Sequence, residues 1–368
     1  MGSIRLLLAL SVIAAHTGAN FGVTGKLAVE LFFLVSGFLI THILVGENHY
    51  RSTKVFYINR ALRIYPIYWL VALTSLALNV VMAFVSASPV FRVFRTAGLD
   101  GMLLLLFSNI AVFLQDGTLF LDKPDGTWRI VDPGSGSHLR LHEGLLVPPA
   151  WSLSLELTFY LLAPFLVRSQ RLLLLTFLGS TFVKISLLLV GLSKSDPWSY
   201  RFFPAELSIF LLGAISYRYI LPIAQRVIMT NNSAFLNVIR IFSLAILLGF
   251  PYYPWDEEGS GFFVIAIMAL CLPALFSIQT ASPIEKILAD LSYPTYLWHV
   301  LVFAAVSRAG HLLGAAFDPG VTFILVALLT ISLAHLTNLT IGRKVEKIRS
   351  AMKRENYSVT AFKKTASE

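Results

Sequence analysis

The chain has 368 residues, of which 56% are hydrophobic and only 13% charged, and its mean hydropathy is +0.74. Soluble globular proteins are about 45–50% apolar and about 25% charged. This chain therefore has too few charged groups to cover a water-exposed surface. The composition excludes a large soluble protein and a disordered chain, and it predicts an integral membrane protein.

The basic residues are concentrated at the end of the chain. The net charge is +9, and residues 342–368, directly after the last apolar run, hold eight Lys or Arg and three acids. A basic segment beside a final span is typical of a cytoplasmic tail next to anionic lipid headgroups. We therefore predict a membrane domain over residues 1–341 and a basic cytoplasmic tail over 342–368, with the lipid bilayer and no nucleic acid as partner.

Ten apolar runs approach the ~20 residues that a helix needs to cross a bilayer. An eleventh run, 101–115, is shorter and is typical of a re-entrant or interfacial segment. We predict an all-α fold, a polytopic membrane helix bundle of about ten transmembrane helices plus this short helix. In chain order, the candidate spans cover residues 4–21, 27–46, 64–86, 151–167, 172–192, 205–221, 241–253, 261–280, 287–307 and 320–341.

The distribution of Lys and Arg predicts the orientation. With a cytoplasmic N-terminus and residues 101–115 not crossing, the inner segments hold 19 Lys and Arg and the outer segments hold nine. The positive-inside rule favours this arrangement. We expect both termini to be cytoplasmic and the protein to lie, as a multi-pass protein, in the inner or plasma membrane of its cell.

The longest non-membrane stretch, residues 116–149, lies outside in this topology. It holds five Gly and four Pro, including Pro-Gly-Ser-Gly-Ser at 133–137, so we expect it to be irregular. A loop of this length is usually functional or disordered. It is either a lid over a substrate site or a mobile surface loop.

Ionisable side chains inside a membrane are costly and are therefore candidates for function. Arg5 and His16 are eleven residues apart in the first span, so they share a helix face about 16 Å apart, with Arg5 at the inner mouth. Glu30 and Glu156 lie in the outer parts of their spans, at the expected depth of His16. A histidine beside a carboxylate is typical of a general base. The alternative is a histidine bonded to a backbone carbonyl.

Two arginines precede the third span on its inner side. Arg60 and Arg63 are three residues apart, so their side chains share a helix face. The planar guanidinium binds two oxygens of a phosphate at once, which predicts a clamp for a polyanion. The alternative is a topology signal only, because the positive-inside rule itself places basic residues here.

Later spans add four polar or aromatic candidates for contacts with a substrate. Ser152 and Glu156 are four residues apart, Tyr160 continues the same helix face, and Trp151 opens the span. His299 lies in the middle of a span, after an aromatic stretch. For His299, aromatic packing with one hydrogen-bonded histidine is the alternative to a ligand role.

Common cofactor motifs are missing from the sequence. It has no Cys-x-x-Cys pair and no His-Glu-x-x-His helix motif, so we predict no metal site. It also lacks a Gly-rich phosphate loop and a Gly-x-Ser-x-Gly elbow. Any chemistry is therefore expected to rest on the intramembrane His, Glu and Arg side chains.

Taken together, these motifs resemble the acyltransferase-3 family of bacterial membrane acyltransferases, over residues 4–340. The family pattern usually has a glycine where Ala28 stands and often an aspartate where Glu30 stands. Five segments carry the resemblance, in the family's order: Arg5 with His16, residues 25–38, residues 56–66, residues 151–156 and residues 291–299.

The resemblance implies an activity and a set of roles. Family members transfer an acyl group, commonly acetyl, from cytoplasmic acyl-CoA to a hydroxyl of an extracytoplasmic or lipid-linked acceptor, usually a sugar. Acetyl-CoA is thus the expected donor substrate, and the early end of the chain suggests the form without a carboxyl-terminal SGNH-type domain.

The implied roles divide the candidate residues between donor and acceptor. Arg5, Arg60 and Arg63 would face the CoA phosphates, and the small residues Ser36 and Gly37 would let the pantetheine arm pass between helices. His16 would deprotonate the acceptor hydroxyl, with Glu156 or Glu30 orienting its ring. A covalent acyl-histidine is the other route.

Two rival classes share the composition. A proton-coupled transporter or flippase would also carry buried acids and histidines, but no inverted repeat is visible and the basic cluster suits a bound nucleotide better. A purely structural membrane scaffold would leave the number of buried ionisable residues without an explanation.

Overall fold

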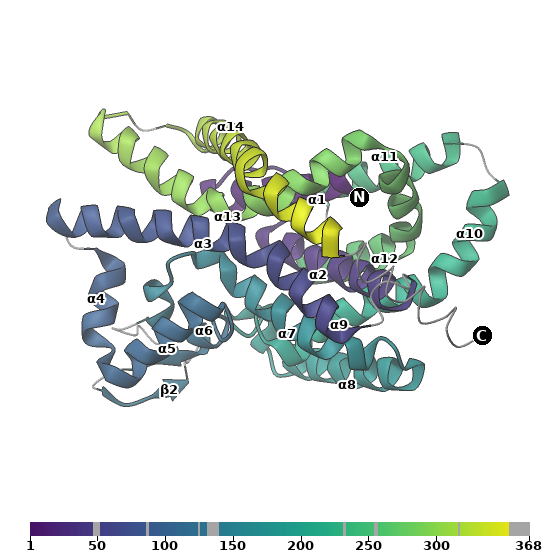
Figure 1. Cartoon of the computed structure of the whole chain (residues 1–368), viewed down its shortest axis with the longest axis horizontal. Helices are drawn as coiled ribbons and strands as arrows, with labels where there is room; N and C mark the ends of the chain where they lie inside the picture. Colours follow the sequence, from purple (N-terminus) through teal and green to yellow (C-terminus); the bar gives the residue numbers. More distant parts are fainter. Residues whose placement is uncertain are drawn as a thin grey trace. The chain divides into compact units, whose positions relative to one another are not determined.

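The computed structural model is almost entirely helical (Figure 1). It describes residues 1–46, 52–85, 88–123, 126–130, 140–230, 233–253, 257–315 and 317–352. The predicted Pro-Gly-Ser-Gly-Ser segment at 133–137 and the tail beyond residue 352 lie outside these ranges.

The helices follow the apolar runs of the sequence. They are α1 (Gly2–Thr17), α2 (Gly25–Thr41), α3 (Thr53–Val85), α4 (Pro89–Thr96), α5 (Gly98–Ala111), α6 (Gly117–Phe120), α7 (Trp151–Leu166), α8 (Gln170–Leu189), α9 (Phe203–Ile215), α10 (Leu221–Thr230), α11 (Ser233–Gly249), α12 (Glu257–Ala281), α13 (Pro283–Leu312) and α14 (Pro319–Thr337).

Short elements connect or extend these helices. The π-helical turns are η1 (His42–Gly46), η7 (Ser216–Ile220) and η9 (Asn338–Gly342), and the 3₁₀ turns are η4 (Leu141–Gly144), η5 (Pro148–Ala150), η6 (Leu192–Lys194) and η8 (Phe250–Tyr252). The two-residue strands β1 (Leu121–Asp122) and β2 (Arg129–Ile130) pair antiparallel.

The predicted all-α, polytopic bundle is confirmed. Seven helical stretches among the described residues are long and apolar enough to cross a bilayer: Gly25–Gly46, Thr53–Phe84, Gln170–Leu189, Phe203–Arg226, Ala234–Tyr252, Glu258–Ile278 and Pro319–Met352. The other three of the ten expected spans coincide with α1, α7 and α13. The run expected to be re-entrant or interfacial forms α5, which has only 14 residues.

Local sequence explains where several helices begin. The Thr24 hydroxyl accepts a hydrogen bond from the Leu27 N–H at the start of α2. Ser282 caps α13 in the same way, with Pro283 at the first helical position, and Asp318 caps α14. Each cap satisfies backbone N–H groups that the first helical turn leaves without intrahelical partners.

The chain divides into two compact units. Unit 1 comprises Met1–Ile67, Ala163–Phe177 and Ile209–Glu368, and unit 2 comprises Tyr68–Leu162 and Leu178–Ser208. In unit 1, α1 packs against α2, α13 and α14, and α2 packs against α12 and η7. Figure 1 shows the purple α1 beside the green-to-yellow α13 and α14.

Glycines let the unit 1 helices approach backbone to backbone. A Cβ atom at Gly37 of α2 would lie 1.8 Å from the carbonyl oxygen of Phe210 in α9, and one at Gly213 would lie 2.0 Å from the carbonyl oxygen of Leu34. Small residues at such crossings are typical of membrane bundles, where close packing replaces the hydrophobic effect. This close contact explains why position 37 is a glycine.

Unit 2 has its own apolar core, and a polar side chain anchors part of the 116–149 stretch. The core is formed by Val93, Ala97, Leu105, Leu141 and Leu145. The Asn109 side chain donates to the Gly144 carbonyl at 3.0 Å and accepts from the Leu146 N–H at 2.7 Å. The described parts of the 116–149 stretch thus form short helices, an antiparallel pair of two-residue strands, and turns that are held by hydrogen bonds.

Gly37→Ala is expected to destabilise the protein, because its Cβ would overlap a backbone oxygen that no side-chain movement can clear. Overpacking of this kind costs about 1–3 kcal/mol, so the thermal unfolding temperature of the purified protein in detergent should fall. Gly179→Ala in α8 is the matched control, since its Cβ would meet nothing within 4 Å. Equal unfolding temperatures for the two variants would contradict this account of the crossing.

Candidate functional site

Two histidines from opposite ends of the sequence meet in unit 1. The ring centroids of His16, near the end of α1, and His299, in the middle of α13, are 5.0 Å apart, with their planes inclined at 44°. His16 is exposed in the isolated chain, whereas His299 is fully buried. The pair therefore joins an accessible imidazole to one held inside the bundle.

The hydrogen bond made by His299 defines its tautomer. Its Nδ1 lies 2.6 Å from the carbonyl oxygen of Tyr296, and a carbonyl can only accept, so Nδ1 carries the proton and Nε2 has a lone pair. Within the described residues this buried Nε2 has no hydrogen-bond partner. The aromatic packing expected as the alternative for His299 is also present, because the Tyr296 ring lies 5.7 Å away.

The two candidate carboxylates lie in different units. Glu30 is 4% exposed in α2, which packs against α1 within unit 1. Glu156 is in the unit 2 part of α7 and accepts a hydrogen bond from the Tyr160 hydroxyl, as their spacing on one helix face suggests. Ser152, also on α7, donates to the Pro149 carbonyl at 3.0 Å, which closes the turn before the helix.

Trp151 is enclosed by polar and aromatic neighbours within unit 2. The Arg201 guanidinium lies over its ring at 4.3 Å from the centroid, and the Tyr200 ring meets it edge-on at 5.3 Å. Asp196 pairs with the Arg201 Nε at 2.5 Å. These contacts leave Trp151 only 6% exposed, and its ring packs against Tyr200 and Arg201.

The predicted arginines have different surroundings. Arg5 is partly buried in the second turn of α1. Arg60 is 7% exposed and donates to the Asn59 side chain at 3.0 Å. Arg63 instead lines a cavity of about 360 Å³, of which Arg60 is not a lining residue. The surroundings of Arg60 and Arg63 therefore differ, and their joint role as a phosphate clamp stays a prediction.

The two small residues predicted to line the path of the pantetheine arm lie on α2. Ser36 is partly buried and Gly37 is fully buried. The α9 backbone occupies the space beside Gly37, as described above.

A second cavity lies where α1 ends; Ala15 lines it, and His16 is not one of its lining residues. The cavity has a volume of about 380 Å³ and is lined by Ala15 and Asn20 at the end of α1, by the aromatic rings of Phe250 and Tyr253, and by Ser260. The Ser260 hydroxyl is buried and has no hydrogen-bond partner among the described residues. A cavity with aromatic walls and a few polar groups is typical of a small-molecule site.

The buried ion pair of Lys184 with Glu206 could not be identified from the sequence, which indicated no role for either residue. The structure joins them at 2.7 Å from Nζ to Oε1, with the side chains 12% and 1% exposed. The two residues lie on α8 and α9 within unit 2. The signal in the sequence was a lysine and a glutamate, 22 residues apart, each within an apolar run. Two opposite charges in neighbouring apolar runs could have suggested an ion pair.

The segments of unit 2 around α5, β1 and β2 hold further polar contacts. Lys123 donates to Asp100 and lies 5.0 Å from the centre of the Trp128 ring. The hydrogen bond from Lys123 lowers the pKa of Asp100 to about 2. Burial raises the pKa of Asp116, against a 2.6 Å hydrogen bond from the Ser154 hydroxyl that opposes it.

No group of three or more His, Cys, Asp or Glu side chains is arranged to hold a metal ion within the described ranges. His138 and His142 have the four-residue spacing of two ligands on a helix, but His138 lies outside the described residues. His142 lies in the 3₁₀ turn η4.

The fold and the site define a polytopic membrane protein with a histidine pair between its first helix and α13. The sequence model of the family described as "Acyltransferase domain" (acyltransferase-3) matches residues 2–338. The chain belongs to this family, as its motifs suggest. No solved structure matches it.

Curated relatives are distant but cover most of this chain. It is 24% identical over 322 residues to the peptidoglycan O-acetyltransferase OatA of Listeria monocytogenes, covering 80% of this chain and 48% of that protein. It is 24% identical over 308 residues to the exopolysaccharide production protein ExoZ of Rhizobium meliloti, covering 82% and 83%. It is 23% identical over 330 residues to the O-acetyltransferase OatA of Staphylococcus aureus, and the match covers 82% of this chain and 50% of that protein. The chain thus spans about half the length of the OatA relatives.

Variants of Lys184 and Glu206 test whether this buried ion pair only stabilises the fold or also relays protons. Glu206→Gln leaves a buried ammonium without its carboxylate, which should lower the free energy of unfolding by about 3–5 kcal/mol. Glu143→Gln is the control, because its pair with Arg92 is exposed and worth about 0–1 kcal/mol. Thermal unfolding in detergent measures both.

The double variant Lys184→Met/Glu206→Leu removes both charges and should regain most of the stability, together with acyl transfer. A stable double variant without transfer would contradict the structural role.

Proposed function

We propose that this membrane acyltransferase transfers an acyl group, most simply acetyl, from cytoplasmic acyl-CoA to a hydroxyl of an extracytoplasmic or lipid-linked glycan. The observation that carries the proposal is the pair of His16 and His299, an accessible imidazole beside a buried one with a defined tautomer. The names of the relatives, which act in peptidoglycan O-acetylation and exopolysaccharide production, support a glycan acceptor.

His16 is the general base of the proposed reaction. It takes the proton from the acceptor hydroxyl while that oxygen attacks the thioester carbonyl carbon. The carbon–sulfur bond breaks, an ester forms, and the proton passes from His16 to the departing CoA thiolate. The products are one O-acyl ester and one free CoA thiol, and His16 is regenerated.

His299 is a positioning residue in this scheme. Its Nδ1–H donates to the Tyr296 carbonyl oxygen, so its Nε2 is left as a hydrogen-bond acceptor. An N–H group of the neighbouring His16 imidazole could donate to this Nε2. This bond would orient the His16 ring and stabilise its protonated form. In the alternative route, His16 attacks the thioester first and an acyl-histidine transfers the group to the acceptor.

We assign the two carboxylates and the cavity at the end of α1 to the acceptor side. Glu30 is buried on a helix that packs against α1, so its charge acts through a medium of low polarity. Glu156, bonded to Tyr160, is proposed as an orienting carboxylate on α7. The cavity lined by Asn20, Tyr253 and Ser260 offers hydrogen-bonding groups and aromatic faces to a sugar.

The proposed topology places the donor and the acceptor on opposite faces of the membrane. The inner end of α1 carries Arg5 and its outer half carries His16, with both termini cytoplasmic in the inner or plasma membrane. The excess of Lys and Arg in the inner segments supports this orientation.

His16→Ala is expected to abolish acyl transfer, because it removes the base, while insertion and folding remain normal. General-base catalysis contributes about 10²–10⁴-fold, so the turnover number should fall at least that far. His311→Ala, at an exposed histidine near the end of α13, is the matched control and should keep wild-type activity. Acetyl ester formation from labelled acetyl-CoA measures the rate, and substantial transfer by the His16 variant would overturn the base assignment.

Glu156→Gln keeps the side-chain shape and removes its charge. We expect a lower kcat with little change in the KM for acyl-CoA, since this carboxylate acts on the acceptor side. Steady-state kinetics of Glu156→Gln measures kcat and KM separately. Glu143→Gln, in the 116–149 stretch, is the control and should change neither. An unchanged kcat would contradict the role of Glu156 and would indicate that Glu30 orients the His16 ring.

A further inference from the structure

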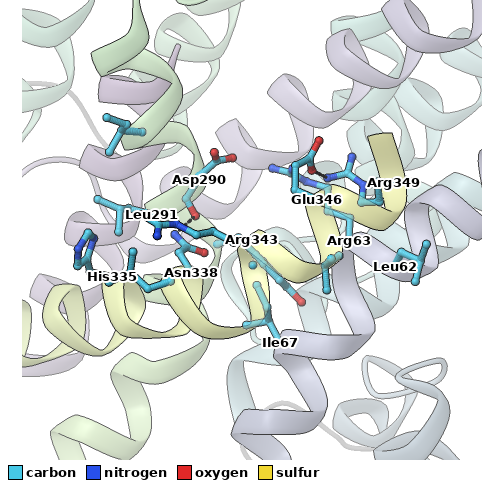
Figure 2. Close-up of a pocket in the computed structure, with 15 residues that line it drawn as sticks. Leu62, Arg63, Ile67, Asp290, Leu291, His335, Asn338, Arg343, Glu346 and Arg349 are labelled. Atoms are coloured by element: carbon cyan, nitrogen blue, oxygen red, sulfur yellow. Dashed lines mark hydrogen bonds and ion pairs between the residues drawn. The ribbon is translucent and has the colours of Figure 1, made fainter. Parts of the chain in front are cut away.

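A basic cavity lies in unit 1 where the family match ends. Its volume is about 360 Å³, and it is lined by the inner end of α3, by α13 and by α14 with its helical continuation to Met352 (Figure 2). Three arginines line it: Arg63 from α3, and Arg343 and Arg349 from the continuation. The family pattern ends at residue 338, so two of the three come from beyond it.

The three guanidinium groups are held differently. Arg349 is almost buried and fixed, because it pairs with Glu346 at 2.5 Å and donates to the Asn59 side chain at 3.1 Å. Asn59 also accepts from Arg60, which links the family's arginine motif to this cavity. Arg63 and Arg343 have no ion pair or hydrogen bond to any other described residue.

The chemistry of the lining indicates the ligand class. Arginine forks bind the oxygens of phosphates through paired, charge-assisted hydrogen bonds. One further carboxylate, Asp290, lines the cavity and would accept from hydroxyl or amino groups of the same ligand. Leu62, Ile67 and Leu291 supply apolar walls. A ligand that combines phosphate with a hydrogen-bond donor and an apolar or flat part fits all three features.

We propose that this cavity binds a phosphate-bearing molecule, and that Arg343 and Arg349 complete the site together with Arg63. Two sources share this chemistry: the nucleotide end of acyl-CoA and the headgroup of an anionic phospholipid. The assignment to acyl-CoA rests on the proposed function, whereas phosphate binding as such does not.

The position of the cavity along α13 favours the nucleotide. Asp290 lines the cavity, and His299 lies nine residues further along the same helix. At 1.5 Å per residue, the two levels are about 14 Å apart. An extended pantetheine arm covers a comparable length, so a CoA molecule with its phosphates among the arginines would bring its thioester to the level of the histidine pair.

The test uses the full chain in nanodiscs of neutral lipid, titrated calorimetrically with CoA. Arg343→Gln is the main variant, because this side chain is exposed and its loss should not disturb folding. Lys344→Gln is the matched control, since Lys344 is an exposed neighbour that does not line the cavity. Arg343→Gln should weaken CoA binding about ten- to a hundredfold, and Lys344→Gln should leave it unchanged.

A second measurement separates the two sources. Native mass spectrometry counts phosphatidylglycerol molecules retained by the wild type and by both variants. If Arg343→Gln loses a bound phosphatidylglycerol while its CoA affinity stays normal, the site binds a lipid headgroup and the phosphate assignment stands. If Arg343→Gln matches Lys344→Gln in both CoA affinity and lipid retention, the proposal is overturned.

Failure of the proposed function would look different. A wild-type protein that forms no acyl ester, yet loses CoA affinity in Arg343→Gln, would contradict the reaction and support the cavity. Normal ester formation with no effect of Arg343→Gln on either ligand would contradict the cavity and support the reaction.

Discussion

The packing of α1 against α13 is the contact on which the candidate site depends. At one end of this contact the helices approach so closely that a Cβ at Gly2 would lie 1.8 Å from the Glu285 carbonyl oxygen. Toward the other end of α1, the same pairing brings the rings of His16 and His299 to 5.0 Å. Because the backbone hydrogen bonds of both helices are satisfied internally, this alignment positions the two imidazoles without any loop.

The helices of this protein could be predicted from the sequence because the bilayer leaves the backbone few alternatives. Each apolar run had to satisfy its own N–H and C=O groups, and so each became a helix. The single-residue candidates at His16, Glu30 and Glu156 followed from the cost of ionisable groups in such runs.

Contacts between distant segments could not be predicted in the same way. The partner of His16 is a histidine on α13, and nothing local to either residue indicates that pairing. Lys184 and Glu206 show the same difficulty, because only the packing of α8 with α9 brings them to 2.7 Å. Helix periodicity predicts that Arg60 and Arg63 share one face, but it does not indicate that α13 and the continuation of α14 form a cavity with Arg63.

The central claim is that the protein consumes acyl-CoA to make an ester, and one measurement tests it most directly. Purified protein reconstituted in liposomes is given acetyl-labelled acetyl-CoA and a polysaccharide acceptor, and both free CoA thiol and acceptor-bound acetyl ester are counted. The account predicts that they appear in a one-to-one ratio and only with the protein present. Proton or glycan movement across the membrane without any ester, as a transporter or flippase would produce, would contradict it.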